Sequence, residues 1–360
     1  MEPLIQRYND DKGVWDSCAE IYEEKVVRGH PDIALMEDFE ENLLDALLRH
    51  IADRTDRPIK LFDLGCGSGR LHIRYGAKTT SVRELPDDHP ISELKKHKPE
   101  LEYDPVLDDG LKEVEGVDFS QKMIDLAEAK VDEYCIDETS DVEFTLKQGS
   151  AFEADYDGRE CLPVAVCLIN SIGVMQGEAG AVRLFEAMRN VTEDAGGVAL
   201  ISCYRKRYFP YYGLGQYEST LTVSGQPVWL VPDTYAGEEY VLESHTYKRA
   251  YSEDDTVLAE VYTAGGDKVE DEFVLRRDPE AVAAAVRTGR IRTHAGYNSR
   301  WYDVEQIREW IEALWTGGRY HIKSKDVDAV RAEPGQLAVM DSGGLCKGLF
   351  ERWGVTRVFN

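Results

Sequence analysis

Three glycines at alternate positions after an apolar run are the part of this sequence that most clearly implies chemistry. Residues 59–64 predict a buried strand, and the glycines follow in the segment Asp63-Leu64-Gly65-Cys66-Gly67-Ser68-Gly69. Glycine lacks a Cβ and readily adopts positive φ angles, so a ligand can lie against the backbone of a tight turn between strand and helix. The pattern therefore predicts a nucleotide-like ligand at the carboxyl end of a parallel strand.

The residues beside the turn narrow the class of ligand. A dinucleotide fingerprint requires a small residue three positions after the second glycine, where this chain has Arg70. Asp63 would repel a pyrophosphate but attract the ammonium and sulfonium groups of S-adenosylmethionine. The segment resembles motif I of class I S-adenosylmethionine-dependent methyltransferases, D-x-G-x-G-x-G, and matches every fixed position of it.

A second acid extends the resemblance. The segment Glu115-Gly116-Val117-Asp118-Phe119-Ser120 predicts the end of a strand, followed by a helix with Ser120 as its N-cap and apolar residues at helical spacing. In the family, the acid at this strand end binds both ribose hydroxyls, which implies that role for Asp118. Each such charge-assisted hydrogen bond contributes about 1.5–3 kcal/mol. Read from the residues alone, Asp118 could instead be a solvated capping residue.

Two more strand ends complete the site that the resemblance implies. Residues 142–146 predict a third strand, and Ser150 stands where the family has an acid, so the Ala151 amide and packing would hold the adenine. Residues 164–169 predict a fourth strand, whose tip, Asn170, would face the methionine part of the cofactor and the substrate. Core packing of Phe152 and a turn-forming role for Asn170 are the alternatives. The implied cofactor residues are Tyr22, Asp63, Gly65, Cys66, Gly67, Gly69, Asp118, Phe119, Ser150, Ala151 and Asn170.

The elements that position these residues alternate as in a doubly wound α/β fold. We expect a Rossmann-like seven-stranded sheet, mostly parallel with its last strand antiparallel, and helices at 31–52 and 177–192. Residues 1–203 would contain N-terminal lid helices and most of this core, and 301–360 its last helix and final strands. Tyr22 would close over the methionine carboxylate, unless its helix is simply an amphipathic core helix. Residues 75–112 form a polar insertion, either a surface excursion or a border of the site.

Residues 204–300 do not follow the α/β pattern. They contain short β-type runs at 221–223, 240–251, 257–262 and 269–275, separated by Gly, Pro and Asp. The layout resembles the antiparallel sheet that forms the substrate lid of glycine/sarcosine and nucleotide-sugar N-methyltransferases. We therefore expect an inserted antiparallel β lid in this part of the chain.

Candidates for substrate chemistry lie in or beside this insertion. A base is required only if the acceptor arrives protonated, and the candidates are Tyr204, His245, His294 and Tyr297. Three consecutive basic residues at 205–207 suggest an anionic substrate group, with Arg205, Tyr211 and Arg300 as substrate-binding candidates, unless they form a charged turn that pairs with acids. No metal site is expected, because Asn170 has no adjoining acid that could ligate Mg²⁺.

Acidic residues outnumber lysine and arginine by 68 to 42 over 360 residues, which gives a formal net charge of −26. Such a charge repels nucleic-acid phosphates, so we expect no nucleic-acid partner. It is typical of a protein that stays soluble in concentrated salt, where the Debye length falls to about 3 Å. We therefore expect a halophilic source and a melting temperature that rises from dilute buffer to molar salt. An unchanged melting temperature would contradict this expectation.

The seven cysteines include no C-x-x-C pair, and four of them, at 66, 161, 167 and 203, fall in or beside predicted core strands or the glycine turn. Buried thiols of this kind indicate a reducing cytoplasm. No apolar run approaches membrane length and no signal peptide is recognised, so a cytoplasmic protein without a membrane partner is expected.

These expectations combine into one function. The resemblance implies a methyltransferase that uses S-adenosylmethionine to methylate nitrogen or oxygen of a small molecule. Methylation of tRNA or protein is one alternative. A non-catalytic protein that binds S-adenosylmethionine is the other.

Overall fold

The computed structural model describes residues 31–81, 85–175, 177–204, 302–315, 318–324, 335–346 and 348–349. It also describes 15–16, 19–20 and 23, and the strands that lie between 222 and 293. Sequence-based predictions for other residues lie outside the described part of the chain.

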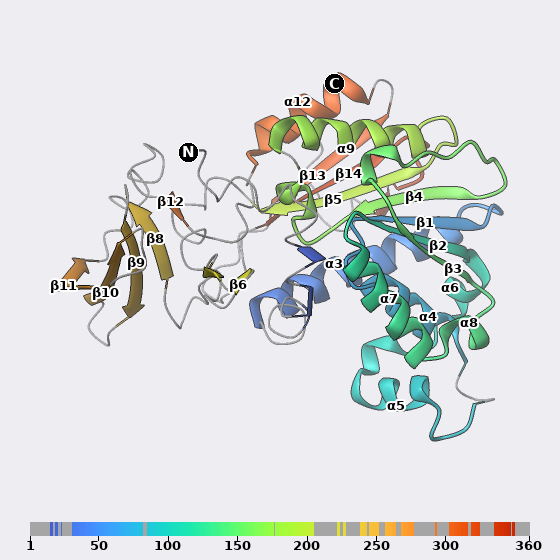
Figure 1. Ribbon diagram of the computed structural model, residues 1–360. Coiled ribbons are helices and arrows are strands. Elements are labelled where there is room, and N and C mark those ends of the chain that lie inside the picture. The colour runs from blue at the N-terminus through green and yellow to red at the C-terminus, as the bar shows by residue number, and fades with distance from the viewer. Residues whose placement is uncertain are drawn as a thin grey trace.

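A seven-stranded sheet lies between helices on the right of Figure 1, with the strand order β13-β14-β5-β4-β1-β2-β3. Strands β1 to β5 are parallel, whereas β14 runs antiparallel to both of its neighbours. This confirms the Rossmann-like, mostly parallel sheet with an antiparallel final strand. The strands are β1 Ile59–Leu64, β2 Leu111–Asp118, β3 Glu143–Gln148, β4 Leu162–Cys167, β5 Val198–Tyr204, β13 Arg319–Ser324 and β14 Gly335–Asp341.

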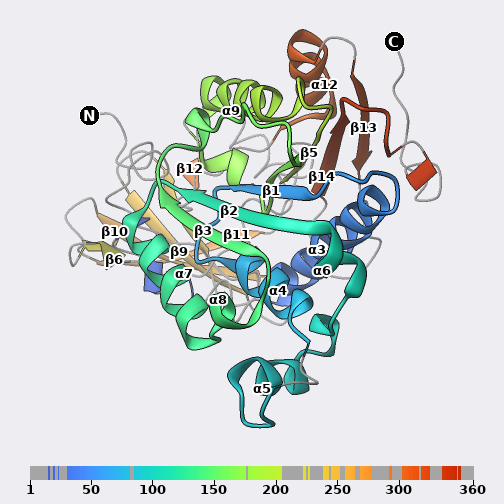
Figure 2. The same ribbon diagram turned by 90° about the vertical axis from the view of Figure 1, so that its right-hand side faces the viewer.

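Helices cover both faces of the sheet (Figures 1 and 2), as its nearly continuous apolar strands require. One face packs against α3 (Pro31–Ala52) and α4 (Arg70–Thr79), through Leu44, Leu48, Leu61, Leu71 and Val164 among others. The other packs against α9 (Gly177–Thr192) and α12 (Val304–Leu314), with Phe62, Ala165, Phe185 and Ile307 in the core. Helix α7 (Gln121–Glu133) follows β2, and the short α8 (Ile136–Thr139) precedes β3.

The order of strands along the chain reverses between β4 and β1, which are neighbours in the sheet. In open α/β sheets, ligands bind outside the carboxyl ends of the strands at such a switch point. The glycine turn after β1 lies at this switch point. The topology of the sheet and the sequence therefore indicate the same residues as a ligand-binding site.

The polar insertion is shorter than the sequence suggests. Helix α4 continues to Thr79, and β2 begins at Leu111, so only 80–110 lie between regular core elements. These residues form α5 (Pro90–His97), a 3₁₀ turn (Pro99–Leu101) and α6 (Pro105–Gly110). Their polar sequence hides a core contact, since Leu107 of α6 is buried in the main apolar cluster together with Tyr75 of α4. The insertion is therefore partly a core element, not only a surface excursion.

Ion pairs fix α3 against α4. Arg74 and Lys78 of α4 both reach Asp45 of α3, at 2.7 and 3.1 Å, and Tyr75 donates to the same carboxylate at 3.2 Å. The two cations are four residues apart and so project from one face of α4. Because Arg70 lies one turn earlier on this face, the start of α4 beside the glycine turn is tied to α3 as well.

A second, antiparallel sheet lies between β5 and α12 in the sequence, as expected. Its order is β11-β10-β9-β8-β12. The run at 240–251, read as one segment, is divided between two strands that pair with each other, β8 and β9. The strands are β8 Glu238–Leu242, β9 His245–Tyr251, β10 Thr256–Thr263, β11 Lys268–Arg276 and β12 Arg292–Thr293, with a separate pair β6 Thr222–Val223 and β7 Gln226–Pro227.

Candidate functional site

The glycine turn is anchored to the neighbouring strand β2. The amides of Gly65 and Cys66 both donate to the carbonyl of Val117, at 2.8 and 3.1 Å. All three glycines have positive φ, 89° at Gly65, 52° at Gly67 and 79° at Gly69. An L-residue rarely adopts this conformation, so the alternation of glycines is what lets the chain turn from β1 into α4 within five residues.

The space around the Cβ position differs among the three glycines of the turn. A Cβ at Gly69 would lie 2.7 Å from the Ala127 Cβ of α7, and one at Gly65 would lie 3.3 Å from the Ser171 Cβ. Gly67 differs, because no heavy atom of the described residues lies within 4 Å of its Cβ position. Two glycines thus permit close packing of protein against protein, while Gly67 leaves space open.

Replacing Gly69 with alanine is expected to destabilise the protein by about 2–4 kcal/mol, since overpacking against Ala127 adds to left-handed strain. Gly67→Ala, which carries the strain without the clash, should cost only about 1–2 kcal/mol. Urea unfolding of the two variants measures the difference, and equal losses would contradict the packing role of Gly69.

Asp118 connects the turn with the end of β2. Its Oδ2 accepts a hydrogen bond from the Gly67 amide at 2.9 Å, and its Oδ1 accepts one from the Ser120 amide at 2.9 Å. Burial raises the pKa of this carboxyl to about 6, although both amides oppose the shift. Ser120 itself caps α7, with its Oγ accepting from the Met123 amide at 3.2 Å. Asp118 is therefore a buried residue that orients the glycine turn, not a solvated cap.

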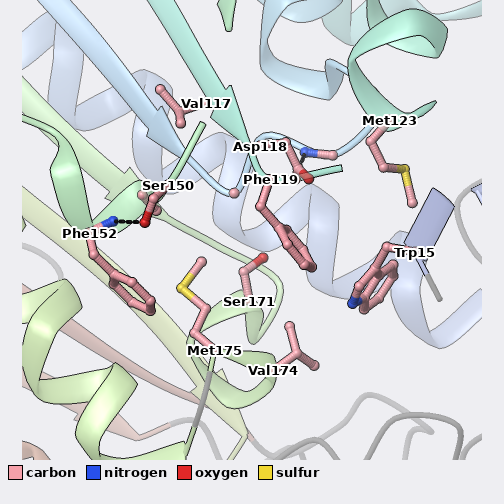
Figure 3. A pocket seen from close by; sticks show the side chains of 13 residues that line it. Trp15, Val117, Asp118, Phe119, Met123, Ser150, Phe152, Ser171, Val174 and Met175 are labelled. Carbon is pink, nitrogen blue, oxygen red and sulfur yellow. Dashed lines mark hydrogen bonds between the residues drawn. The ribbon is translucent and has the colours of Figure 1, made fainter. Parts of the chain in front are cut away.

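A cavity of about 250 Å³ opens beside these residues at the carboxyl edge of the sheet (Figure 3). Its walls come from the glycine turn, from the segments after β2, β3 and β4, and from the N-terminal segment. In Figure 3, Phe119 and Met123 stand on one side, with Ser171 and Met175 across from them. The lining residues are Trp15, Gly65, Gly67, Val117, Asp118, Phe119, Met123, Ser150, Ala151, Phe152, Ser171, Val174 and Met175.

The connection from β3 to β4 contributes one wall. Ser150 Oγ accepts from the Phe152 amide at 3.3 Å and caps the 3₁₀ turn Ala151–Glu153. The Phe152 ring packs against the apolar cluster below α9 and also lines the cavity, with the Arg183 guanidinium carbon 4.3 Å from its ring centroid. Phe152 is thus both a core residue and a site residue.

Asp63 lies beneath the turn, not on the cavity wall. It is 5% exposed, and burial raises the pKa of its carboxyl to about 7, while Arg70 opposes the shift and Asp118 adds to it. Cys66 is also buried, and burial raises the pKa of its thiol well above the usual range. A thiol held neutral in this way supports packing rather than nucleophilic chemistry.

The fourth strand ends two residues earlier than predicted, at Cys167. Ile169 and Asn170 have φ of 50° and 55°, and two left-handed residues in succession turn the chain away from the sheet. Asn170 is buried at this turn and does not line the cavity. Ser171, Val174 and Met175, from the 3₁₀ turn Ser171–Val174 and its end, form this wall instead.

The N-terminal segment closes one side of the cavity. Trp15 lines it, and Asp16 Oδ1 accepts from Ser120 Oγ at 2.6 Å and from the Lys122 amide at 3.2 Å. Further along, Glu23 pairs with Lys130 of α7 at 2.6 Å. Tyr22, the lid residue that the resemblance implies, lies outside the described residues.

The sequence-predicted residues divide into three groups. Gly65, Gly67, Asp118, Phe119, Ser150 and Ala151 line the cavity, whereas Asp63, Cys66, Gly69 and Asn170 are placed around it. The side chains of Tyr204, at the end of β5, and His245, at the start of β9, are not described. Lying entirely outside the described residues are Tyr22, Arg205, Tyr211, His294, Tyr297 and Arg300.

Sequence reasoning assigned Phe119 and Ala151 to the site but not the other apolar side chains of its lining. Phe152 was left open between a core role and a site role, and Met123 counted only among the apolar residues at helical spacing after Ser120. The available signal was position, because several of the lining residues, such as Phe152 and Ser171, lie in the connections that follow a strand end. The lining residues that were not assigned are Trp15, Val117, Met123, Phe152, Ser171, Val174 and Met175.

Fold and cavity together define a Rossmann-like α/β protein with a ligand cavity at the topological switch point of its sheet. No protein-family model matches the chain, and no curated protein matches it. Solved structures do match. An S-adenosylmethionine-dependent methyltransferase from Clostridium acetobutylicum is 15% identical over 92% of this chain and 99% of its own, with a TM-score of 0.43.

Two other solved structures have similar scores. Magnesium protoporphyrin IX methyltransferase from Synechocystis, with S-adenosylhomocysteine bound, is 11% identical over 92% of this chain and 99% of its own, with a TM-score of 0.43. An S-adenosylmethionine-dependent methyltransferase from Methanosarcina mazei is 10% identical over 81% of this chain and 95% of its own, with a TM-score of 0.39.

The described part of the chain bears on two features predicted from composition, the buried cysteines and the lack of a membrane-spanning segment. Cys66, Cys161, Cys167 and Cys203 are all buried thiols, as the sequence predicts. Among the described helices, none combines the length and the apolar character that crossing a membrane requires.

Proposed function

We propose that this protein is an S-adenosylmethionine-dependent methyltransferase that methylates nitrogen or oxygen of a small molecule. The observation that carries the proposal is the open Cβ position of Gly67 at a cavity whose wall also presents the Asp118 carboxylate. A backbone without a side chain, beside an acid at the end of β2, is the arrangement that an adenosyl ligand needs.

The charges around the cavity favour a cationic ligand over a phosphate. Among the described residues that line it, Asp118 is the only charged one, and Asp63 lies buried beneath the turn. No lysine or arginine belongs to this lining, so the oxygens of a pyrophosphate would find no cation there. The ammonium and sulfonium groups of S-adenosylmethionine fit this environment.

The residues present can hold each part of the cofactor. Asp118 would bind the ribose hydroxyls, and Phe119, Met123 and Phe152 would pack against the adenine. The turn at 65–69, with Asp63 below it, would hold the methionine part. When bound, S-adenosylmethionine supplies a methyl group on a sulfonium, which is already a good electrophile.

The protein's own contribution is then alignment and exclusion of water. Holding the acceptor in line with the methyl group could supply about 7–11 kcal/mol. Ser171, Val174 and Met175 form the wall nearest to the ends of β4 and β5, after which the inserted sheet begins in sequence. We assign substrate binding to Arg205, Tyr211 and Arg300. If the acceptor arrives protonated, the candidates for the general base are Tyr204, His245, His294 and Tyr297. Asn170, which is buried behind the Ser171 wall, is assigned no direct contact with the acceptor.

Methyl transfer from labelled cofactor into fractionated cell extract tests the proposal. Label in low-molecular-weight products would support a small-molecule acceptor, and label in tRNA or protein would replace it with the macromolecular alternative. Calorimetric binding of S-adenosylmethionine without transfer to any fraction would indicate the non-catalytic alternative. Absence of binding at millimolar concentration would refute the proposal.

The raised pKa of Asp63 predicts that cofactor binding releases protons. Burial favours the neutral carboxyl, so its contribution to folding stability falls as the pH rises from about 4 to about 7. A bound cation favours the ionised form and lowers the pKa again. Affinity should therefore increase from pH 5.5 to pH 7.5, with protons released. Calorimetry in two buffers of different ionisation enthalpy measures the release, Asp63→Asn should abolish most of it, and proton uptake would contradict the prediction.

A further inference from the structure

Glu40 of α3 joins the ends of two strands that are far from it in sequence. It is 2% exposed, and its Oε2 accepts from the backbone amide of Ile169, after β4, at 3.2 Å. Its Oε1 accepts from Ser202 Oγ, near the end of β5. One buried carboxylate thus connects a helix with the carboxyl ends of β4 and β5, where β5 leads to the inserted sheet.

The Ile169 amide belongs to a strained turn. Ile169 and Asn170 both have left-handed φ, and a β-branched residue is the kind that tolerates this conformation least. Such a turn persists only where surrounding contacts fix it. The hydrogen bond from Glu40 is a contact that fixes the backbone at the strained residue itself.

The turn determines where one wall of the cavity lies. It leads directly into Ser171, which lines the cavity and lies opposite Gly65, with 3.3 Å between its Cβ and the Cβ position of that glycine. A displacement of the turn would therefore change the space between the glycine turn and the β4 wall.

We infer that Glu40 is a positioning residue that holds the Ile169–Asn170 turn and thereby the Ser171 wall of the cavity. The identity of the ligand rests on the proposed function, but the positioning does not. Its hydrogen bonds to both strand ends depend on its length, and it also forms an ion pair with Arg70, whose Nη2 lies 3.7 Å from its Oε2. Burial raises the pKa of Glu40 to about 7, although Arg70 opposes the shift.

Two substitutions of Glu40 separate the effect of its side-chain length from the effect of its charge. Glu40→Gln keeps the length, since the amide oxygen can accept from the Ile169 amide while the amide nitrogen donates to Ser202 Oγ. Glu40→Asp keeps the charge but is one methylene too short to bridge both strand ends. Glu41→Asp is the matched control, because Glu41 pairs with Arg70 and Arg74 from the same helix without contacting the turn.

Calorimetric titration with S-adenosylhomocysteine and hydrogen exchange of the 169–175 segment test the inference. We expect Glu40→Asp to weaken binding at least tenfold and to speed exchange of this segment in the ligand-free protein. Glu40→Gln and Glu41→Asp should each stay within threefold of the original affinity. Ile169→Gly, which relieves the left-handed strain, should restore at least threefold in the Glu40→Asp background.

The outcomes distinguish this inference from the proposed function. Unchanged exchange in Glu40→Asp, or an equal effect of Glu41→Asp, would overturn the positioning role. A larger loss in Glu40→Gln than in Glu40→Asp would show that charge, not side-chain length, is what matters, and would overturn it too. Faster exchange in Glu40→Asp, in a protein that never binds S-adenosylhomocysteine, would support the positioning role and refute the proposed cofactor.

Discussion

Replacing Gly67 with valine is expected to weaken S-adenosylmethionine binding at least a hundredfold while the protein still folds. No heavy atom of the described residues lies within 4 Å of the Gly67 Cβ position, so the new side chain clashes with none of them. It would instead project beside the Gly67 backbone at the cavity, where the proposed ligand lies. The left-handed φ of 52° should cost about 1–2 kcal/mol of stability. Calorimetry measures the affinity and urea unfolding the stability.

Gly196→Val is the matched control for this experiment. Gly196 also has a left-handed φ, of 70°, and no heavy atom of the described residues lies within 4 Å of its Cβ position, but it precedes β5 at the opposite edge of the sheet. It should lose the same stability as Gly67→Val and keep full affinity. If Gly67→Val binds S-adenosylmethionine as tightly as Gly196→Val does, the ligand does not lie at the glycine turn.

Replacing Asp118 with alanine is expected to lower cofactor affinity at least tenfold. The carboxylate both lines the cavity and holds the Gly67 amide at 2.9 Å. Loss of the ribose hydrogen bonds would cost about 1.5–3 kcal/mol each, and the glycine turn would lose one anchor. Calorimetric titration with S-adenosylmethionine and S-adenosylhomocysteine measures the loss, which should be similar for both because both carry the ribose.

Asp125→Ala serves as the control for Asp118→Ala. Asp125 lies on the exposed face of α7, where its carboxylate accepts only from Gln121 at 2.8 Å among the described residues. Its removal changes the net charge of the protein by the same amount without touching the cavity. Equal affinity losses in the two variants would mean that general electrostatic attraction, not a ribose contact, explains the effect of Asp118.

Local sequence patterns predicted those elements whose signals are complete within a few residues. The strand Ile59–Leu64 and the helices Pro31–Ala52 and Gly177–Thr192 have the predicted bounds, because apolar periodicity and a definite end signal coincide there. The end of β4 was predicted two residues too late. Apolar residues continue through Leu168 and Ile169, and nothing in that run signals that the backbone turns left-handed.

The sequence predicted only part of the candidate site. Glycines and acids at strand ends are conspicuous, so Gly67 and Asp118 were recognised from the sequence, and both line the cavity. Met175 and Phe152 were not assigned to it, because an apolar side chain in a cavity wall has the same sequence pattern as one in the core. Asn170 was assigned to the site as a polar strand tip, but it is buried at the turn behind the wall.

Residue types within short segments were enough to predict the class of fold, the position of the glycine turn and the acids near it. Which of these groups come into contact depends on tertiary packing. The Asp118 carboxylate bonds an amide 51 residues away, and Glu40 bonds groups 129 and 162 residues away. Contacts at such separations depend on how strands and helices pack together, and no local pattern encodes them.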